Sequence, residues 1–175
     1  MPNRSTSRAQ SKSTRKTATR RTATENNVIA LLKADHKKVK KMFKEFEKYA
    51  QQGDEAAKVE IAMQICMELK VHTQVEEEIL YPALYEALDE HDLVDEAIVE
   101  HATAKELIAQ IESMVGSDDL YDAKVMVLSE YIDHHVEEEE KEIFPKARKA
   151  RMDLEGLGES VAFRKEELMA PMATH

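Results

Sequence analysis

Residues that end helices occur at only a few widely spaced places in this sequence, and this spacing limits the folds that the chain can adopt. Turn signals fall at Gly53-Asp54, at Asp89 to Asp92 and at Gly116-Ser117. Thr22 and Glu25 have the spacing of a capping box just before the apolar residues begin. We therefore predict four long helices, over about residues 25–51, 55–88, 92–115 and 117–152. Because short connections make consecutive long helices antiparallel, the predicted fold is all-α, an up-down-up-down four-helix bundle.

The composition supports a helical protein rather than a β-sandwich or barrel. The 175 residues include only four glycines and four prolines, while charged residues reach 34%. Each glycine falls at a predicted break, and Gly156 and Gly158 mark a predicted loop before a short amphipathic C-terminal segment. Cys66 is the single cysteine, which rules out an internal disulfide. With no long apolar run and no signal-peptide pattern, we expect a soluble, cytoplasmic protein.

Charge divides the chain into a basic tail and an acidic remainder. Residues 1–24 contain no acid and carry +7, so the rest carries −17, because the whole chain carries −10. The tail has almost no large apolar residue, which predicts a disordered segment. A weak, nonspecific contact between this tail and nucleic acid is one alternative, and a purely solubilising tail is the other. The predicted division is a tail over 1–24, the bundle over 25–152 and an extension over 153–175.

Each predicted helix carries a histidine in register with its apolar face. His36 lies on the stripe of Val28, Leu32, Val39 and Phe43, and the other three helices repeat this arrangement. Two helices also place a glutamate four residues after the histidine, on the same face. Burying a glutamate is costly unless it is paired or bound to a metal. The inward-facing set is His36, His72, Glu76, His101, His135 and Glu139.

A repeat selects these residues from their neighbours. The segments HTQVEEEILYP and HVEEEEKEIFP share the pattern H-x-x-x-E-x-x-x-x-x-P at an offset of 63 residues. His134 and Glu138 have the same i,i+4 spacing, but counting back from Pro145 selects His135 and Glu139. We therefore expect His134 to point elsewhere and Glu137, Glu138 and Glu140 to form a solvated face. Counted from the turns, the six inward residues lie at similar heights, so they can meet in one layer.

Such a set predicts a two-metal site. Imidazole nitrogen and carboxylate oxygen suit iron, manganese or zinc. Four histidines and two glutamates exceed what one tetrahedral zinc needs, and they suit two octahedral metals that share carboxylates. The Glu-x-x-His pattern of ferritin-like proteins is absent from the sequence.

With these motifs, the sequence resembles the hemerythrin-like (HHE cation-binding) family. The resemblance covers about residues 25–150 and rests on Asp35-His36, on Glu100-His101 and on the two H-x-x-x-E motifs with their prolines. It implies a four-helix bundle that holds two iron ions in a non-haem di-iron centre. By position, the ligands would be the six inward residues, with Glu76 and Glu139 as bridges.

One departure from the family pattern bears on function. Oxygen carriers of the family have H-x-x-x-H on the third helix, whereas Lys105 stands four residues after His101. The leading hypothesis is therefore a di-iron protein that binds dioxygen, peroxide or nitric oxide for sensing or stress response. One alternative is an enzyme that acts on peroxide or oxygen through the same site. The other is a nucleic-acid-associated helical scaffold that acts through the basic tail.

Overall fold

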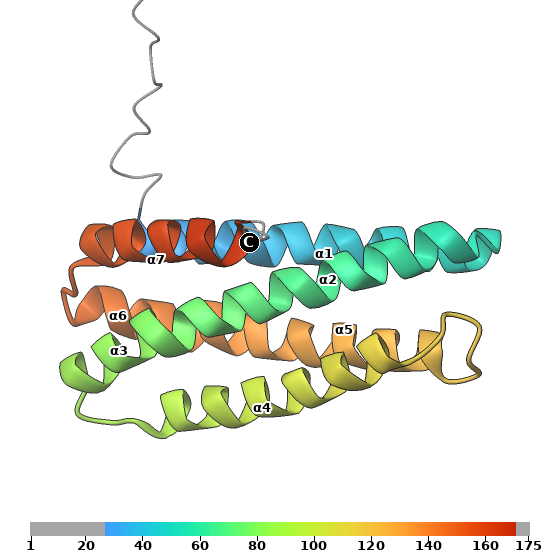
Figure 1. Cartoon of the computed structure of the whole chain (residues 1–175). Coiled ribbons are helices and arrows are strands. Elements are labelled where there is room, and N and C mark those ends of the chain that lie inside the picture. The colour runs from blue at the N-terminus through green and yellow to red at the C-terminus, as the bar shows by residue number, and fades with distance from the viewer. Residues whose placement is uncertain (1–26, 171–175) are drawn as a thin grey trace, which may run out of the picture.

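The computed structural model describes residues 27–170, which are helical and contain no strand. Four long helical segments lie side by side and alternate in direction (Figure 1), so the predicted all-α, up-down-up-down bundle is confirmed. None of the helices in this part of the chain is long and apolar enough to cross a membrane. In order, the helices are α1 (Val28–Gln52), α2 (Glu55–Val75), α3 (Tyr81–Ala87), α4 (Asp92–Ser113), α5 (Tyr121–Glu138), α6 (Phe144–Lys149) and α7 (Leu154–Met169).

Local hydrogen bonds fix the start of α1 and the turn that joins α1 to α2 in the first hairpin. Asn27 has an extended backbone and accepts a hydrogen bond from the Ile29 amide at 2.9 Å, so α1 starts at Val28. The proposed Thr22–Glu25 capping box lies outside the described residues. Gly53 closes α1 in the left-handed conformation, with φ 70°, which glycine adopts without steric cost. Asp54 then caps α2, as the sequence predicts.

The connection between α4 and α5 is longer than the sequence indicates. Ser117 does not cap a helix, because α5 begins only at Tyr121. Instead, Asp118 folds the connection back and accepts a hydrogen bond from the Val115 amide at 2.9 Å. The buried Lys58 of α2 donates to the Gly116 carbonyl at 3.1 Å, which ties this connection to the neighbouring helix.

The two repeated prolines follow wide helical turns. The π-helical turns η1 (Glu76–Leu80) and η2 (Glu139–Ile143) each begin at a glutamate of the repeat. Pro82 and Pro145 come shortly after, near the start of α3 and α6. A proline ring inside an α-helix clashes with the carbonyl four residues earlier, and widening the preceding turn relieves that clash. The effect of each proline is therefore a π-helical turn at the site glutamate.

The core consists of two apolar clusters with the polar layer between them. One cluster contains Val39, Phe43, Leu69 and Ile108, and the other contains Val28, Leu32, Val75 and Ala97, among further residues. Along α1, His36 comes between Leu32 and Val39, which belong to different clusters. His72, His101 and His135 are likewise flanked along their helices by members of both clusters. Packed hydrocarbon on both sides therefore holds the polar layer in place.

A further helix, α7, departs from the prediction for the C-terminus. Gly156 and Gly158 lie inside this 16-residue helix and not in a loop. Asp153 caps it by accepting a hydrogen bond from the Gly156 amide at 3.0 Å. The helix runs back along α1 and α2 (Figure 1) and buries Val161 completely. Residues 154–169 are thus a packed part of the fold, and the reason is the apolar side that α7 turns toward α1.

Candidate metal centre

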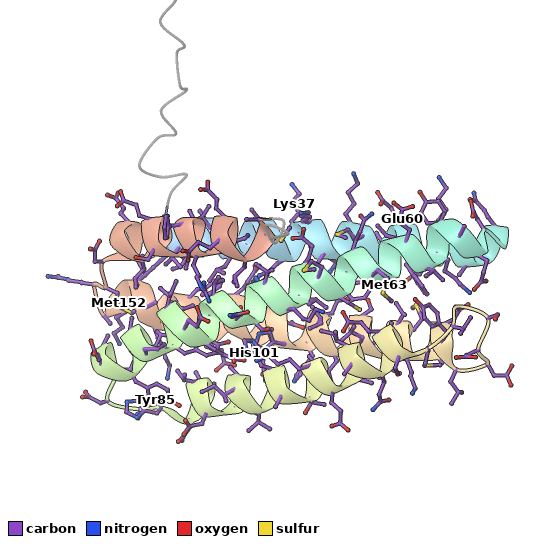
Figure 2. All side chains as sticks on the ribbon, viewed as in Figure 1. Lys37, Glu60, Met63, Tyr85, His101 and Met152 are labelled. Carbon is purple, nitrogen blue, oxygen red and sulfur yellow. The ribbon has the colours of Figure 1, made fainter. Side chains whose placement is uncertain are left out.

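The structure gathers all six predicted site residues in the middle of the bundle. Ligand atoms of His36, His72, Glu76 and Glu139 lie within 4.8 Å of one another, and so do those of Glu76, His101 and His135. All six side chains are buried. Figure 2 shows His101 in the space between α4 and the helices that face it. Glu76 belongs to both groups, which places its carboxylate between two candidate metal positions.

The four imidazoles present the same nitrogen to the centre of this layer. The Nε2 atoms of His36 and His72 are 3.2 Å apart, and those of His101 and His135 are 3.1 Å apart. Each pair joins the two helices of one hairpin. Two Nε2 atoms at this separation can bind the same ion, so the histidine pairs define one position in each hairpin.

The two glutamates lack the partners that buried carboxylates normally have. Glu76 and Glu139 are fully buried, and none of their four carboxylate oxygens accepts a hydrogen bond. Glu76 Oε1 is 3.1 Å from His72 Nε2, and Glu139 Oε2 is 3.2 Å from His36 Nε2, but neither contact has hydrogen-bond geometry. Buried carboxylates without donors are strongly destabilising. A cation at the centre would satisfy them.

The pKa shifts also indicate that the buried layer contains more negative charge than its positive groups balance. Burial alone lowers the pKa of His72, but the Glu76, Asp35 and Glu139 carboxylates more than offset it and raise that pKa to about 10. Burial and the neighbouring Glu76 charge raise the pKa of the Glu139 carboxyl. For Glu76, burial also acts upward, but the His72 and His101 imidazoles outweigh it and hold the pKa well below its usual range. Two acids therefore compete for the positive charge that the imidazoles can offer.

A second layer of four carboxylates orients the four imidazoles. His72 Nδ1 lies 3.2 Å from Asp35, and His135 Nδ1 lies 2.6 Å from Glu100, each within one hairpin. With Nδ1 donating its proton to a carboxylate, Nε2 is left free to bind a metal. In the sequence, Asp35 and Glu100 stand out only because each directly precedes a histidine.

The other two carboxylates connect the hairpins to each other. His101 Nδ1 is 3.0 Å from Glu77, and His36 Nδ1 is 2.8 Å from Glu140. The prediction that Glu140 belongs to a solvated face is therefore wrong, because its carboxylate reaches back over the bundle to α1. Glu77 and Glu140 each follow a repeated glutamate, so the 63-residue offset in the sequence carried the signal for this pair.

The two adjacent histidines of α5 occupy different environments. The His135 side chain is 5% exposed and faces the layer, whereas the His134 side chain is 64% exposed. His134 points toward Glu138 and Glu100 at the surface, with its Nε2 atom 3.6 Å and 4.0 Å from their carboxylates. The structure thus places His135, and not His134, with the other five residues.

Comparison with known proteins assigns this arrangement to a family. Residues 27–147 match the model of the hemerythrin HHE cation binding domain, and this range contains all six residues of the buried layer. The chain belongs to the hemerythrin HHE cation binding domain family. The HHE domain therefore contains a buried cluster of histidine and glutamate that suits a metal.

Two known proteins are similar to this chain. A solved hemerythrin HHE cation binding domain-containing protein of Mycobacterium kansasii has the same fold, with a TM-score of 0.65 and 24% sequence identity, and the match covers 81% of this chain and 86% of that one. A protein of Nostoc sp. named DNA nickase is 31% identical over 123 residues, which is 70% of this chain and 34% of that protein. The chain thus spans about a third of the length of the Nostoc protein.

Two residues at the His101 side distinguish the halves of the centre. The Tyr81 hydroxyl lies 3.2 Å from His101 Nε2, whereas the residue at the corresponding repeat position is Phe144, whose ring stacks on His36. Burial and the Glu76 charge hold the pKa of Tyr81 well above its usual value, so the phenol stays protonated. Lys105 turns away from the centre, and its amine bonds both oxygens of Glu77 at 2.7 and 2.6 Å.

The donor set fits a pair of metal ions by its chemistry and by its unmet hydrogen bonds. His36, His72, Glu76 and Glu139 offer four donors to one position, and Glu76, His101 and His135 offer three to the other. Mixed imidazole and carboxylate donors suit iron, manganese or zinc. Glu139 Oε2 lies nearer the first position, 3.2 Å from His36 Nε2 against 3.9 Å from His135 Nε2, so the second position has more room for an added ligand.

Replacing Glu139 by glutamine tests whether the centre is built for a cation. The neutral amide removes a buried charge, so we expect the metal-free protein to gain about 1–3 kcal/mol in free energy of unfolding. Because the folded-state pKa of Glu139 is raised, the wild-type carboxyl costs stability as pH rises through that pKa. The gain should therefore be larger at about pH 8 than at about pH 5.

Denaturant unfolding of the metal-free proteins measures this gain, and Glu137→Gln is the matched control. Glu137 is exposed and pairs with Lys141, so its replacement should change the stability little. Added metal should stabilise the wild type more than Glu139→Gln, which keeps the three donors of the second position. A Glu139→Gln protein less stable than the wild type without metal would contradict this account of the centre.

The paired variants His135→Ala and His134→Ala test the register of the second motif. His135→Ala removes one of the converging Nε2 atoms, so we expect it to lose at least one metal ion per chain. His134→Ala removes an exposed imidazole and should leave metal content and thermal stability nearly unchanged. Elemental analysis of both proteins after identical purification decides the matter, and equal losses in the two variants would refute the assigned register.

Proposed function

We propose that this HHE domain holds two iron ions in a non-haem centre and binds dioxygen, peroxide or nitric oxide there, in sensing or stress response. The observation that carries the proposal is the pair of fully buried glutamates without hydrogen-bond donors, faced by four imidazole nitrogens. When bound, the iron pair supplies redox capacity and free coordination positions. The protein supplies the donors, the second layer that orients them and the hydrocarbon that excludes water.

The difference between the two halves supports ligand binding on the His101 side. Three donors converge closely on that position against four on the His36 side, because Glu139 Oε2 lies 3.9 Å from His135 Nε2 and 3.2 Å from His36 Nε2. The Tyr81 hydroxyl is the polar group nearest to His101 Nε2 apart from the site residues, and it can donate a hydrogen bond to a small molecule held there. Lys105 is engaged by Glu77 and supplies no donor to the centre. These contacts support a site with room for one small ligand.

Anaerobic purification followed by aeration is the experiment that tests this proposal. We expect about two irons per chain and a new near-ultraviolet and visible band when air is admitted. A band that disappears on deoxygenation indicates reversible binding, and one that decays irreversibly indicates an oxidase or sensor. Sustained consumption of peroxide by the pure protein would favour the enzyme alternative. A metal-free protein with an intact helical fold would overturn the proposal.

A second candidate function, association with nucleic acid, has two observations in its favour. Residues 1–24 carry seven basic residues and no acid. The similar Nostoc protein is named a DNA nickase, although this chain covers only a third of it. Basic segments bind the phosphate backbone without sequence preference and lose affinity as salt increases. Under this candidate the HHE domain and the tail carry separate functions.

Replacing the seven basic residues of the tail by serine, in the full-length chain, tests this second candidate. We expect the wild type to be retained on duplex DNA at low salt and the substituted chain to elute early, with the salt dependence of retention lost as well. Metal content should be the same in both proteins. Equal retention of the two chains would remove the tail as a nucleic-acid contact.

A further inference from the structure

The helix α7 lies outside the matched family range, which ends at residue 147, yet it packs close to the metal centre. It contacts α1, α2 and the turn η1, and it lies along the same side of the bundle as α1 (Figure 1). Leu157 and Leu168 pack against the apolar cluster that contains Leu32 and Val75. The hydrocarbon side of α7 thus attaches it to the two helices that carry His36 and His72.

One basic side chain of α7 reaches the second layer of the centre. The Lys165 amine forms an ion pair with Asp35 Oδ1, while Asp35 Oδ2 accepts a hydrogen bond from His72 Nδ1. This pair is largely removed from solvent, because the two side chains are 26% and 12% exposed. Lys165 therefore fixes the carboxylate that in turn fixes the His72 imidazole.

Arg164, the preceding residue of α7, binds the turn η1 that contains Glu76. Arg164 Nε lies 2.7 Å from Glu78 Oε2, and Arg164 Nη2 lies 3.2 Å from Glu78 Oε1. This two-point contact fits the planar guanidinium to the carboxylate and restricts rotation of both groups. Glu78 belongs to η1, two residues after Glu76. Consecutive residues of α7 thus act on His72 and on the turn that positions Glu76.

The other half of the centre is supported differently within residues 27–170, because Lys105 of α4 bonds both oxygens of Glu77, the carboxylate beside His101 Nδ1. Glu100 corresponds to Asp35 in the repeat, and the nearest cationic group to it besides His135 is the exposed His134, at 4.0 Å. Lys141 corresponds to Glu78, and it pairs with Glu137 on its own helix segment. The two halves are therefore alike in their ligands and unlike in their outer contacts.

We propose that α7 is a clamp that holds the His36–His72 half of the metal centre, through Lys165–Asp35 and Arg164–Glu78, and slows metal release from that half more than from the other. This inference rests on the proposed two-metal function. Outer contacts of metal ligands typically change metal affinity by about 10- to 100-fold when they are removed. Residues 164, 165 and 78 are positioning residues here, since none of them offers an atom to the metal.

Metal release from the full-length chain, loaded anaerobically with Fe²⁺ and mixed with excess ferrozine, tests the clamp. We expect the wild type to release iron in a fast and a slow phase of equal size. Arg164→Glu or Glu78→Arg should accelerate the slow phase by about tenfold and the fast phase by clearly less, because the Glu76 carboxylate lies between both positions. The charge-swapped double variant should restore the slow phase. Lys165→Met, which keeps the aliphatic stem, should accelerate the same phase.

Lys141→Met is the matched control, because it breaks an exposed ion pair that does not reach a site residue, and it should alter neither phase. Equal acceleration of both phases by the α7 variants, or no rescue in the double variant, would mean that α7 only supports the fold, and would overturn the clamp. A wild-type chain that takes up fewer than two irons would overturn the proposed function, and the clamp with it. These two failures are told apart by the iron content measured before ferrozine is added.

Discussion

The structure depends on the burial of two carboxylates that the protein itself does not satisfy. Glu76 and Glu139 sit at the centre of a helical bundle with no hydrogen-bond donor to any of their oxygens. An apolar pair of the same size would give a more stable metal-free bundle, because unpaired buried charge opposes folding. The arrangement makes sense as a site whose missing partner is a cation. Metal binding and stability are therefore linked in this fold, since ions that bind only the folded chain also stabilise it.

A duplicated hairpin explains how such a centre is built from simple parts. Each hairpin brings two Nε2 atoms together and adds one glutamate from a π-helical turn that precedes a proline. The second-layer carboxylates follow the same symmetry: Asp35 and Glu100 act within a hairpin, and Glu77 and Glu140 act between hairpins. The inter-hairpin contacts couple the two halves, because moving one hairpin displaces an imidazole of the other. The two halves of the layer are thus joined by direct contacts and lie between two apolar clusters.

The sequence predicted the fold and the buried layer because both depend on periodic patterns. A histidine in register with an apolar face must point inward, and the proline repeat distinguished His135 from His134. Other features depend on contacts between distant segments, which periodicity does not encode. Glu140 contacts His36, which lies 104 residues away in the sequence. Because Glu140 stands in a run of charged residues, it was predicted to face solvent. The role of α7 was missed for a related reason: Gly156 and Gly158 indicate a loop by local propensity, but the burial of Val161 and the Asp153 cap outweigh that propensity.

The departures from twofold symmetry matter most for function, because symmetric ligands alone would make two equivalent metal positions. Two features separate the halves: a phenol at Tyr81 where the other half has Phe144, and α7 on the His36–His72 side. The first places a hydroxyl beside the His101 position. The second is the basis of the proposed clamp on the opposite position. If two ions bind as proposed, the four donors around the His36 position, Glu139 among them, would keep that ion in place while the more open position admits a small molecule.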